Sequence, residues 1–284
     1  MVPSLRHLLR IHLAVLLFGF AGLFGKLLSL SPVVLVFWRV VLASLALLAV
    51  GLFRRGARKP ISRRTLLVLF LLGVLLAVHW TMFFQSVRVS SVALALITYS
   101  TFPVFVAFLE PLCFRERFHA VDVVRAVAAL LGVGILTPNW NPGDRLVQGV
   151  LWGVGSGALF ALLSLLNRKL VREHGNWTLV FYQDLFAAAT LLPFVMPEAM
   201  ALSMADVLLL LVLGIPCTAV AHGLFVDGLQ GVSTRTASAI ACLEPVYGMF
   251  LALVLLQDMP SLRTLLGGGI VLGVAFHATL RPSN

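Results

Sequence analysis

Long apolar runs separated by short polar connectors make up most of the sequence. Each run is close to the ~20 residues that a helix needs to cross the hydrocarbon core of a bilayer. A lone spanning segment must satisfy its own backbone hydrogen bonds, so each run is predicted to be a helix. The ten predicted spans are residues 11–30, 33–52, 66–87, 92–114, 121–136, 149–166, 179–196, 207–226, 236–256 and 262–280.

Composition supports this pattern and excludes a soluble fold. Of 284 residues, 60% are hydrophobic and 11% are charged, whereas an average soluble domain has about 25% charged residues. Ten spans and their connectors leave no room for a sizeable extramembrane domain. The first apolar run is too long for the core of a signal peptide. We therefore expect an all-α polytopic membrane protein that forms one membrane unit.

The net charge of +10 is a topology signal, because the basic residues sit between the apolar runs and form no patch for nucleic acid. With the N-terminus placed inside, most of the 21 lysines and arginines fall in inside segments. This skew predicts that both termini are cytoplasmic. The simple topology is typical of a bacterial inner membrane protein.

The two halves of the chain resemble each other at an offset of about 142 residues. In order, Lys26-Leu27 corresponds to Lys169-Leu170, His79 to His222, Pro103-Val104 to Pro245-Val246, and Gly132 to Gly273. A common order and a nearly constant offset indicate an internal repeat. We predict two five-span repeats, residues 1–142 and 143–284. Because five is odd, the second repeat is inverted, which is typical of alternating-access carriers.

Several motifs also indicate a family. They are Phe37-Trp38-Arg39-Val40, the Pro103 span that ends at Arg115-Glu116-Arg117, and Leu243-Glu244-Pro245-Val246 followed by Leu255-Leu256-Gln257-Asp258. In these motifs the chain resembles the EamA-type ten-span members of the drug/metabolite transporter superfamily. The resemblance implies a secondary transporter, often an exporter, of amino acids, other metabolites, nucleotide sugars or drugs. One departure is Gln257-Asp258, where such proteins commonly carry Gly-Glu.

Two charged residues inside spans are the first candidates for substrate binding. Arg39 can bind a carboxylate bidentately; the alternative is that it snorkels outward or pairs with a structural carboxylate. Its counterpart in the second repeat is Gln183 or the adjacent Asp184. Glu244 can bind an ammonium group or carry a coupling proton. Alternatively, it hydrogen-bonds the backbone loosened around Pro245.

Histidine and aromatic residues complete the predicted site. His79 and His222 occupy matching repeat positions and can titrate near neutral pH, although a histidine in an apolar helix is more often a packing residue. Phe83 shares a helical stripe with His79, and Tyr99 heads another stripe in the following span. Such stripes can line an amphipathic cavity, and helix packing explains them equally well.

No cofactor or metal site is expected, because Cys113, Cys217 and Cys242 are isolated and no histidine has a ligand-spaced partner. No P-loop is present, so the energy would come from coupled protons or from the substrate gradient. Two glycine series are predicted packing seams: Gly19, Gly22 and Gly25, and Gly149, Gly153 and Gly157. We expect a monomer or homodimer in the lipid bilayer that transports a small molecule and is not an enzyme. An intramembrane enzyme or a non-transporting membrane scaffold is the alternative.

Overall fold

The structure is a computed structural model and describes residues 5–53, 61–114, 120–137, 140–174, 176–195, 202–228, 237 and 240–279. The part of the chain that it describes is helical and contains no strand. The all-α polytopic class is therefore confirmed. The arginine-rich connectors at residues 54–60 and 115–119, together with Arg235 and Arg281, lie outside the described residues.

The helices follow the predicted apolar runs. In order they are α1 (Leu5–Ala21), α2 (Phe24–Leu27), α3 (Pro32–Phe53), α4 (Arg63–Val89), α5 (Val92–Tyr99), α6 (Phe102–Phe114), α7 (Ala120–Leu136), α8 (Arg145–His174), α9 (Asn176–Val195), α10 (Met204–Gly214), the π-helix η2 (Ile215–Val220), α11 (Ala221–Gly228), α13 (Glu244–Leu256) and α14 (Leu262–Thr279).

Seven helical segments in the described ranges are long and apolar enough to span a membrane, and two apolar helices, Glu244–Leu256 and Leu262–His277, are shorter. The structure therefore supports ten spans only in part. Helix α7, the predicted fifth span, has 17 residues and carries Asp122 and Arg125 in its first two turns. Much of the first third of the predicted ninth span, residues 236 and 238–239, lies outside the described residues.

Serine residues mark the beginnings of several helices where the chain returns from a connector. Ser62 Oγ accepts a hydrogen bond from Thr65 N at 3.1 Å, and Ser91 Oγ accepts one from Leu94 N at 3.1 Å. At the start of α10, Ser203 and Asp206 form a reciprocal capping box. Each cap satisfies backbone N–H groups that the first helical turn leaves without a partner.

Span 92–114 is not the single helix that its hydropathy predicts. It is divided between Tyr99 and Phe102, where the hydroxyls of Ser100 and Thr101 donate to the carbonyls of Leu96 and Thr98 at 2.8 and 2.7 Å. These bonds satisfy carbonyls in an apolar environment that contains little water. A new helix then begins at Phe102, followed by Pro103, which needs no N–H partner in a first turn.

The ninth segment repeats this feature. Helix α13 begins at Glu244 with Pro245 in its first turn, and Leu243 N donates to Ile240 O at 2.9 Å just before it. The first residues of α6 and α13, Phe102 and Glu244, are separated by the same offset that relates Pro103 to Pro245. The correspondence between the two sequence positions therefore extends to the positions at which two helices begin.

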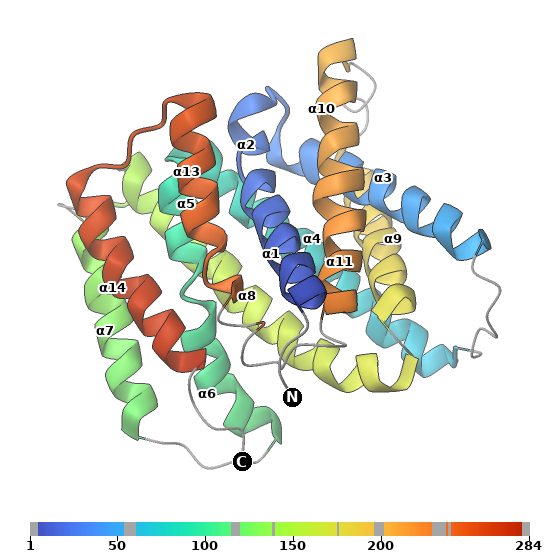
Figure 1. Ribbon diagram of the computed structural model, residues 1–284, viewed down its shortest axis with the longest axis horizontal. Coiled ribbons are helices and arrows are strands. Elements are labelled where there is room, and N and C mark those ends of the chain that lie inside the picture. Colours follow the sequence, from blue (N-terminus) through green and yellow to red (C-terminus); the bar gives the residue numbers. More distant parts are fainter. Residues whose placement is uncertain are drawn as a thin grey trace.

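Helices from the two halves of the chain interleave. Figure 1 shows α7 beside α14 at one edge of the bundle and α3, α9 and α10 at the other, and each of these neighbouring sets is in direct contact. Helix α1 packs against α11 and α13, while α8 packs against α4, α5 and α6. In the same view α1 begins and α14 ends toward the lower end of the bundle.

Glycines of both predicted series lie at close helix contacts, between the halves at Gly19 and at Gly149, Gly153 and Gly157, but within the first half at Gly22 and Gly25. A Cβ atom on Gly19 of α1 would lie 2.8 Å from both Glu244 O and Gly248 N of α13. A Cβ atom on Gly157 of α8 would lie 2.7 Å from Tyr99 O. Only glycine lets these backbones approach so closely. Both seams bring a first helix of one half against the broken helix of the other.

Candidate functional site

Arg39, in α3, is an arginine enclosed by the bundle. Its side chain is 4% exposed, so it does not snorkel to the membrane surface. Its Cζ lies 3.8 Å from the centroid of the Trp80 ring and 5.7 Å from that of Phe84. A guanidinium this close to an indole face gains a cation–π interaction, worth ~2 kcal/mol when it is desolvated.

The π-helix supplies the hydrogen-bond partner of Arg39. Arg39 Nε donates to Thr218 Oγ1 at 2.9 Å, and that hydroxyl donates its own proton to Leu213 O at 2.7 Å. Because the hydroxyl proton is engaged with the carbonyl, the oxygen is held as an acceptor toward Arg39. The wider π turn thus fixes one side of the guanidinium.

Gln183 and Asp184, the two adjacent residues of α9 predicted as alternatives for the repeat counterpart of Arg39, have different surroundings. Gln183 is buried and its side-chain amide donates to Asn167 Oδ1. Asp184 is fully buried and interacts electrostatically with Arg39. Neither carboxylate oxygen of Asp184 has a hydrogen-bond partner among the described residues. Asp184 is therefore the acidic residue of α9 that interacts with Arg39, while Gln183 serves the packing of α8 against α9.

Glu244 approaches the same arginine from the second half of the chain. It is the first residue of α13 and is partly buried. It interacts electrostatically with Arg39 and with Tyr99. A carboxylate at this position also gains from the positive end of the helix dipole. We call Arg39, Thr218, Asp184 and Glu244 the central polar group.

Aromatic rings lie against the central polar group. The aromatic cluster consists of His79, Trp80, Phe83, Tyr99, Phe102 and Phe160, whose rings lie 5.1 to 6.4 Å from neighbouring members. Tyr99 and Phe102 stack across the break between α5 and α6. His222 continues the cluster, with its ring 6.5 Å from Trp80 and 5.2 Å from Phe18.

His79 is held firmly inside this cluster. Its Nδ1 lies 2.9 Å from Ser156 O and 2.8 Å from Ser156 Oγ, and that hydroxyl also contacts His79 O at 3.1 Å. The packing interpretation of His79 is thus satisfied, although its ring also faces Tyr99 and Phe160. Side chains from both halves of the chain fix its orientation.

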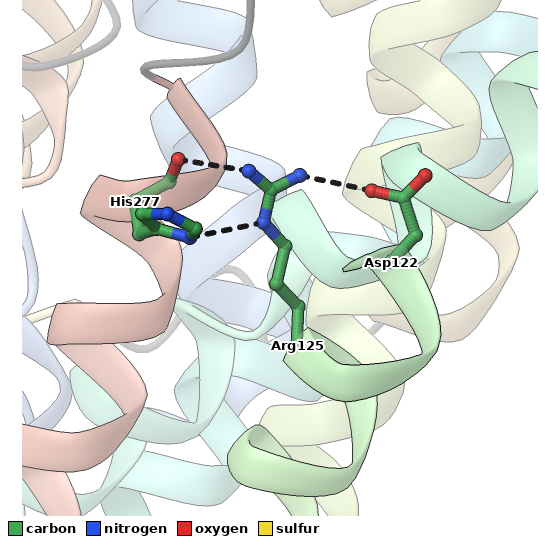
Figure 2. Close-up of polar contacts among 3 residues, drawn as sticks. All are labelled: Asp122, Arg125 and His277. Atoms are coloured by element: carbon green, nitrogen blue, oxygen red, sulfur yellow. Dashed lines mark hydrogen bonds and ion pairs between the residues drawn. The ribbon is translucent and has the colours of Figure 1, made fainter. Parts of the chain in front are cut away.

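Two polar contacts lie away from the centre and join the halves. In Figure 2, Arg125 of α7 donates from Nη1 to Asp122 Oδ1 at 2.9 Å and from Nη2 to His277 O of α14 at 3.1 Å. Arg125 Nε also donates to His277 Nδ1 at 3.2 Å. Elsewhere, Asp258 Oδ2 accepts from Val92 N at 3.2 Å at the start of α5. These contacts stabilise the packing of the two halves of the chain against each other.

The structure brings most of the predicted site residues together: Arg39, His79, Phe83, Tyr99, His222 and Glu244 all belong to the central polar group or to the aromatic cluster and its extension. Gln183 faces Asn167 instead. Sequence reasoning missed Trp80, Phe102, Phe160 and Thr218 as candidate site residues. Trp80 is adjacent to His79, but neither Thr218 nor Phe160 carries a signal that separates it from other apolar-span residues.

No group of three or more His, Cys, Asp or Glu side chains in the described ranges is placed to hold a metal ion. The chemistry available in the site is instead that of a cation, two carboxylates, hydroxyls and aromatic faces. Such a set can bind an organic molecule that has charged and apolar parts.

Fold and site together define a polytopic α-helical membrane protein with a polar centre between its two halves. The chain belongs to the EamA-like transporter family, whose model matches residues 6–137 and again residues 147–279.

Similar proteins agree with this assignment. The chain is 28% identical to the uncharacterized transporter YxxF of Bacillus subtilis (strain 168) over 90% of this chain and 83% of that protein. It is 27% identical to an uncharacterized transporter of Archaeoglobus fulgidus over 92% and 91% of the two chains. A solved crystal structure aligns with a TM-score of 0.66 at 18% identity, covering 96% of each chain, and so shares the fold.

Proposed function

We propose that the protein is a secondary transporter that exports or exchanges small organic metabolites by alternating access, with amphipathic amino acids as the first candidates. The observation that carries the proposal is the enclosed position of Arg39, with Glu244 within electrostatic reach and aromatic rings beside it. A charge enclosed by a transmembrane bundle is costly and marks a functional site by default. The substrate is moved without chemical change.

The site can match both ends of an amino acid. Arg39 offers N–H donors to a carboxylate, Glu244 offers an acceptor to an ammonium group, and Tyr99, Phe102 and Phe160 offer faces to an apolar side chain. A ligand with only one of these parts would leave buried polar groups without partners, which disfavours it. The proposed energy source is either coupled protons or the substrate's own gradient.

The proposed architecture consists of two inverted five-span repeats, residues 1–142 and 143–284. The twofold match of the family model supports it. The contacts between the halves also support it, because the first helix of each half packs against the third and fourth spans of the other half. Helix α1 contacts the α10–α11 segment and α13, and α8 contacts α4 and the α5–α6 segment. Such repeats would rock around the central polar group. The assembly would be a monomer or homodimer.

The proposed orientation places both termini in the cytoplasm of a bacterial cell, with the protein in the inner membrane. The basic inside segments support it. The positions of the start of α1 and the end of α14 toward the same end of the bundle also support it (Figure 1).

Transport in proteoliposomes tests the function. Purified protein is reconstituted, loaded with unlabelled L-phenylalanine or L-leucine, and assayed for exchange with the radiolabelled amino acid. We expect exchange by the wild type and a loss of at least about tenfold in Arg39→Ala, which corresponds to ~1.4 kcal/mol. Arg263→Ala is the matched control, because this arginine is exposed at the start of α14.

Glu244→Gln separates the two charged ends of the substrate. If Glu244 binds the ammonium group, this variant raises the KM for an amino acid but leaves binding of the corresponding carboxylic acid unchanged. Exchange kinetics equal to those of the wild type in both Arg39→Ala and Glu244→Gln would remove these residues from the site. A thermal-shift screen with a metabolite library identifies other substrates, since a ligand of the folded state raises its apparent stability.

A further inference from the structure

Asp184 has an unusual position for an acidic residue. It lies in α9 with no exposed surface, and neither of its oxygens has a hydrogen-bond partner in the part of the chain that the structure describes. An isolated ionised carboxylate in such surroundings costs many kcal/mol, whereas a protonated acid group has no net charge to desolvate. The surroundings of Asp184 therefore favour the bound proton.

Arg39 does not neutralise Asp184 in this arrangement. The two side chains interact electrostatically, but Arg39 donates from Nε to Thr218 and lies over Trp80. No direct ion pair joins Arg39 and Asp184, both of which are described. Two acceptors therefore compete for the guanidinium. It donates a hydrogen bond to the Thr218 hydroxyl and makes no ion pair with the Asp184 carboxyl group.

Among the side chains that the structure describes, the elements packed against α9 bring few other charges toward Asp184. Helix α3 contributes Arg39, and α8 contributes the uncharged Asn167 beside Gln183. Helix α4 lies against α9 at Gly73. Between Gly73 and Trp80 the titratable residue of α4 is His79, whose ring is held by Ser156. Beyond these helices, Arg39 also interacts with Glu244, Cys217 and Tyr99. Arg39 is thus the charge that acts on Asp184.

We propose that Asp184 carries the coupling proton of transport and thereby controls whether Arg39 is available to a substrate carboxylate. This inference rests on the proposed transport function and assigns its proton site. With Asp184 protonated, Arg39 stays on Thr218 and Trp80 and directs its remaining N–H groups to the substrate. When Asp184 releases its proton to water, its carboxylate attracts Arg39, the bond from Nε to Thr218 breaks, and the substrate carboxylate loses its partner.

The cycle is balanced in charge and atoms. One proton binds Asp184 together with one substrate carboxylate on one side of the membrane, and both leave on the other side. Proton and substrate therefore move in the same direction. An inward proton gradient would therefore drive uptake, whereas export would be driven by the substrate's own gradient and would carry a proton outward.

Infrared difference spectroscopy of the purified protein tests the proton site without any substrate. The carbonyl band of a protonated carboxylic acid is followed during a pH titration of the wild type, Asp184→Asn and Glu244→Gln. We expect the titrating acid band in the wild type and in Glu244→Gln, and its loss in Asp184→Asn. Asp184→Glu, which keeps an acid group, should restore a band at a shifted frequency and confirms that substitution at this position is tolerated.

Net uptake of L-phenylalanine into proteoliposomes that contain a trapped pH indicator and no amino acid tests the coupling. The wild type should move protons with the amino acid, and its apparent affinity should change by up to about tenfold per pH unit where the acid band titrates, as expected for one proton. Asp184→Asn, which imitates the protonated acid, should transport the amino acid with less than about twofold pH dependence. Thr218→Val, which removes the competing acceptor, should weaken affinity.

The outcomes distinguish the two proposals. Loss of the acid band in Glu244→Gln and its persistence in Asp184→Asn would overturn the assignment and move the proton to Glu244. Proton movement that persists in Asp184→Asn would also overturn it. If the wild type fails to exchange any tested metabolite, the proposed transport function is wrong, while the spectroscopic result still decides whether Asp184 binds a proton.

Discussion

Replacement of Arg125 by methionine should destabilise the protein strongly, although Arg125 lies far from the proposed site. The side chain is buried and makes hydrogen bonds to the Asp122 carboxylate and to the ring and carbonyl of His277 (Figure 2). Methionine preserves much of the volume but removes the charge and all three bonds. Removal of one partner from a buried ion pair costs about 3–5 kcal/mol, so we expect a loss of ~3 kcal/mol.

The magnitude can be measured as a shift in thermal unfolding in detergent. Cys217 is buried whereas Cys113 is exposed. In a background in which serine replaces Cys113, a dye that becomes fluorescent on reaction with a thiol therefore reports unfolding. For domains of 150–250 residues 1 kcal/mol corresponds to ~2–4 °C, and the expected decrease is roughly 6–12 °C. Arg263→Met, at an exposed arginine, should change the unfolding temperature by little more than the error of measurement.

A double-mutant cycle tests the electrostatic part of this explanation. Asp122→Asn in the Arg125→Met background removes the carboxylate that has lost its guanidinium. The double variant should therefore be more stable than the sum of the single effects predicts, by about 1–3 kcal/mol. A melting temperature of Arg125→Met equal to that of the wild type, or strictly additive effects in the cycle, would refute the reasoning.

Three further changes have defined expectations. Gly157→Ala places a Cβ atom against Tyr99 O and should cost about 1–3 kcal/mol in the same unfolding assay, whereas Gly269→Ala, which meets nothing within 4 Å, should cost nothing; equal effects would contradict the seam. Trp80→Leu removes the ring beneath Arg39 and should reduce stability by ~1–2 kcal/mol beyond the lost packing, an excess that should vanish in an Arg39→Met background. For topology, Ser62→Cys in a background without native cysteines should react with a membrane-impermeant maleimide only in broken cells, and Asp144→Cys in intact cells as well; the opposite pattern would reverse the proposed orientation.

The apolar runs predicted the fold class well because a spanning helix needs little more than length and hydrophobicity. They could not predict where helices break inside the membrane. The division of span 92–114 depends on Ser100 and Thr101 satisfying carbonyls of the preceding turn. Hydroxyl residues in an apolar run do not by themselves indicate where a helix ends, because they can equally bond to the backbone within an unbroken helix. Pro103 indicated the neighbourhood but not the change from one helix to the next.

The candidate site, like the fold, could be predicted from the sequence only in part. Charged residues such as Arg39 and Glu244 stand out in apolar spans because burial of a charge needs a reason. The choice between Gln183 and Asp184 depended on which face of α9 points toward α3, and a one-residue uncertainty in register exchanges the two. Thr218 was hidden for a related reason, because its partnership with Arg39 depends on a π-helix that the sequence pattern does not distinguish from an α-helix.

That π-helix gives the family a simple way to change its specificity. A π segment corresponds to one extra residue within an α-helix. Deletion of a single residue from Ile215–Val220 would restore regular α-helical geometry and turn the chain on one side of the deletion by about 100° relative to the other. Thr218 would then no longer face Arg39, while the contacts of α10 with α3 and of α11 with α1 could not both persist. Insertions and deletions at this point, more than substitutions, are where relatives of this protein could acquire a different partner for the central arginine.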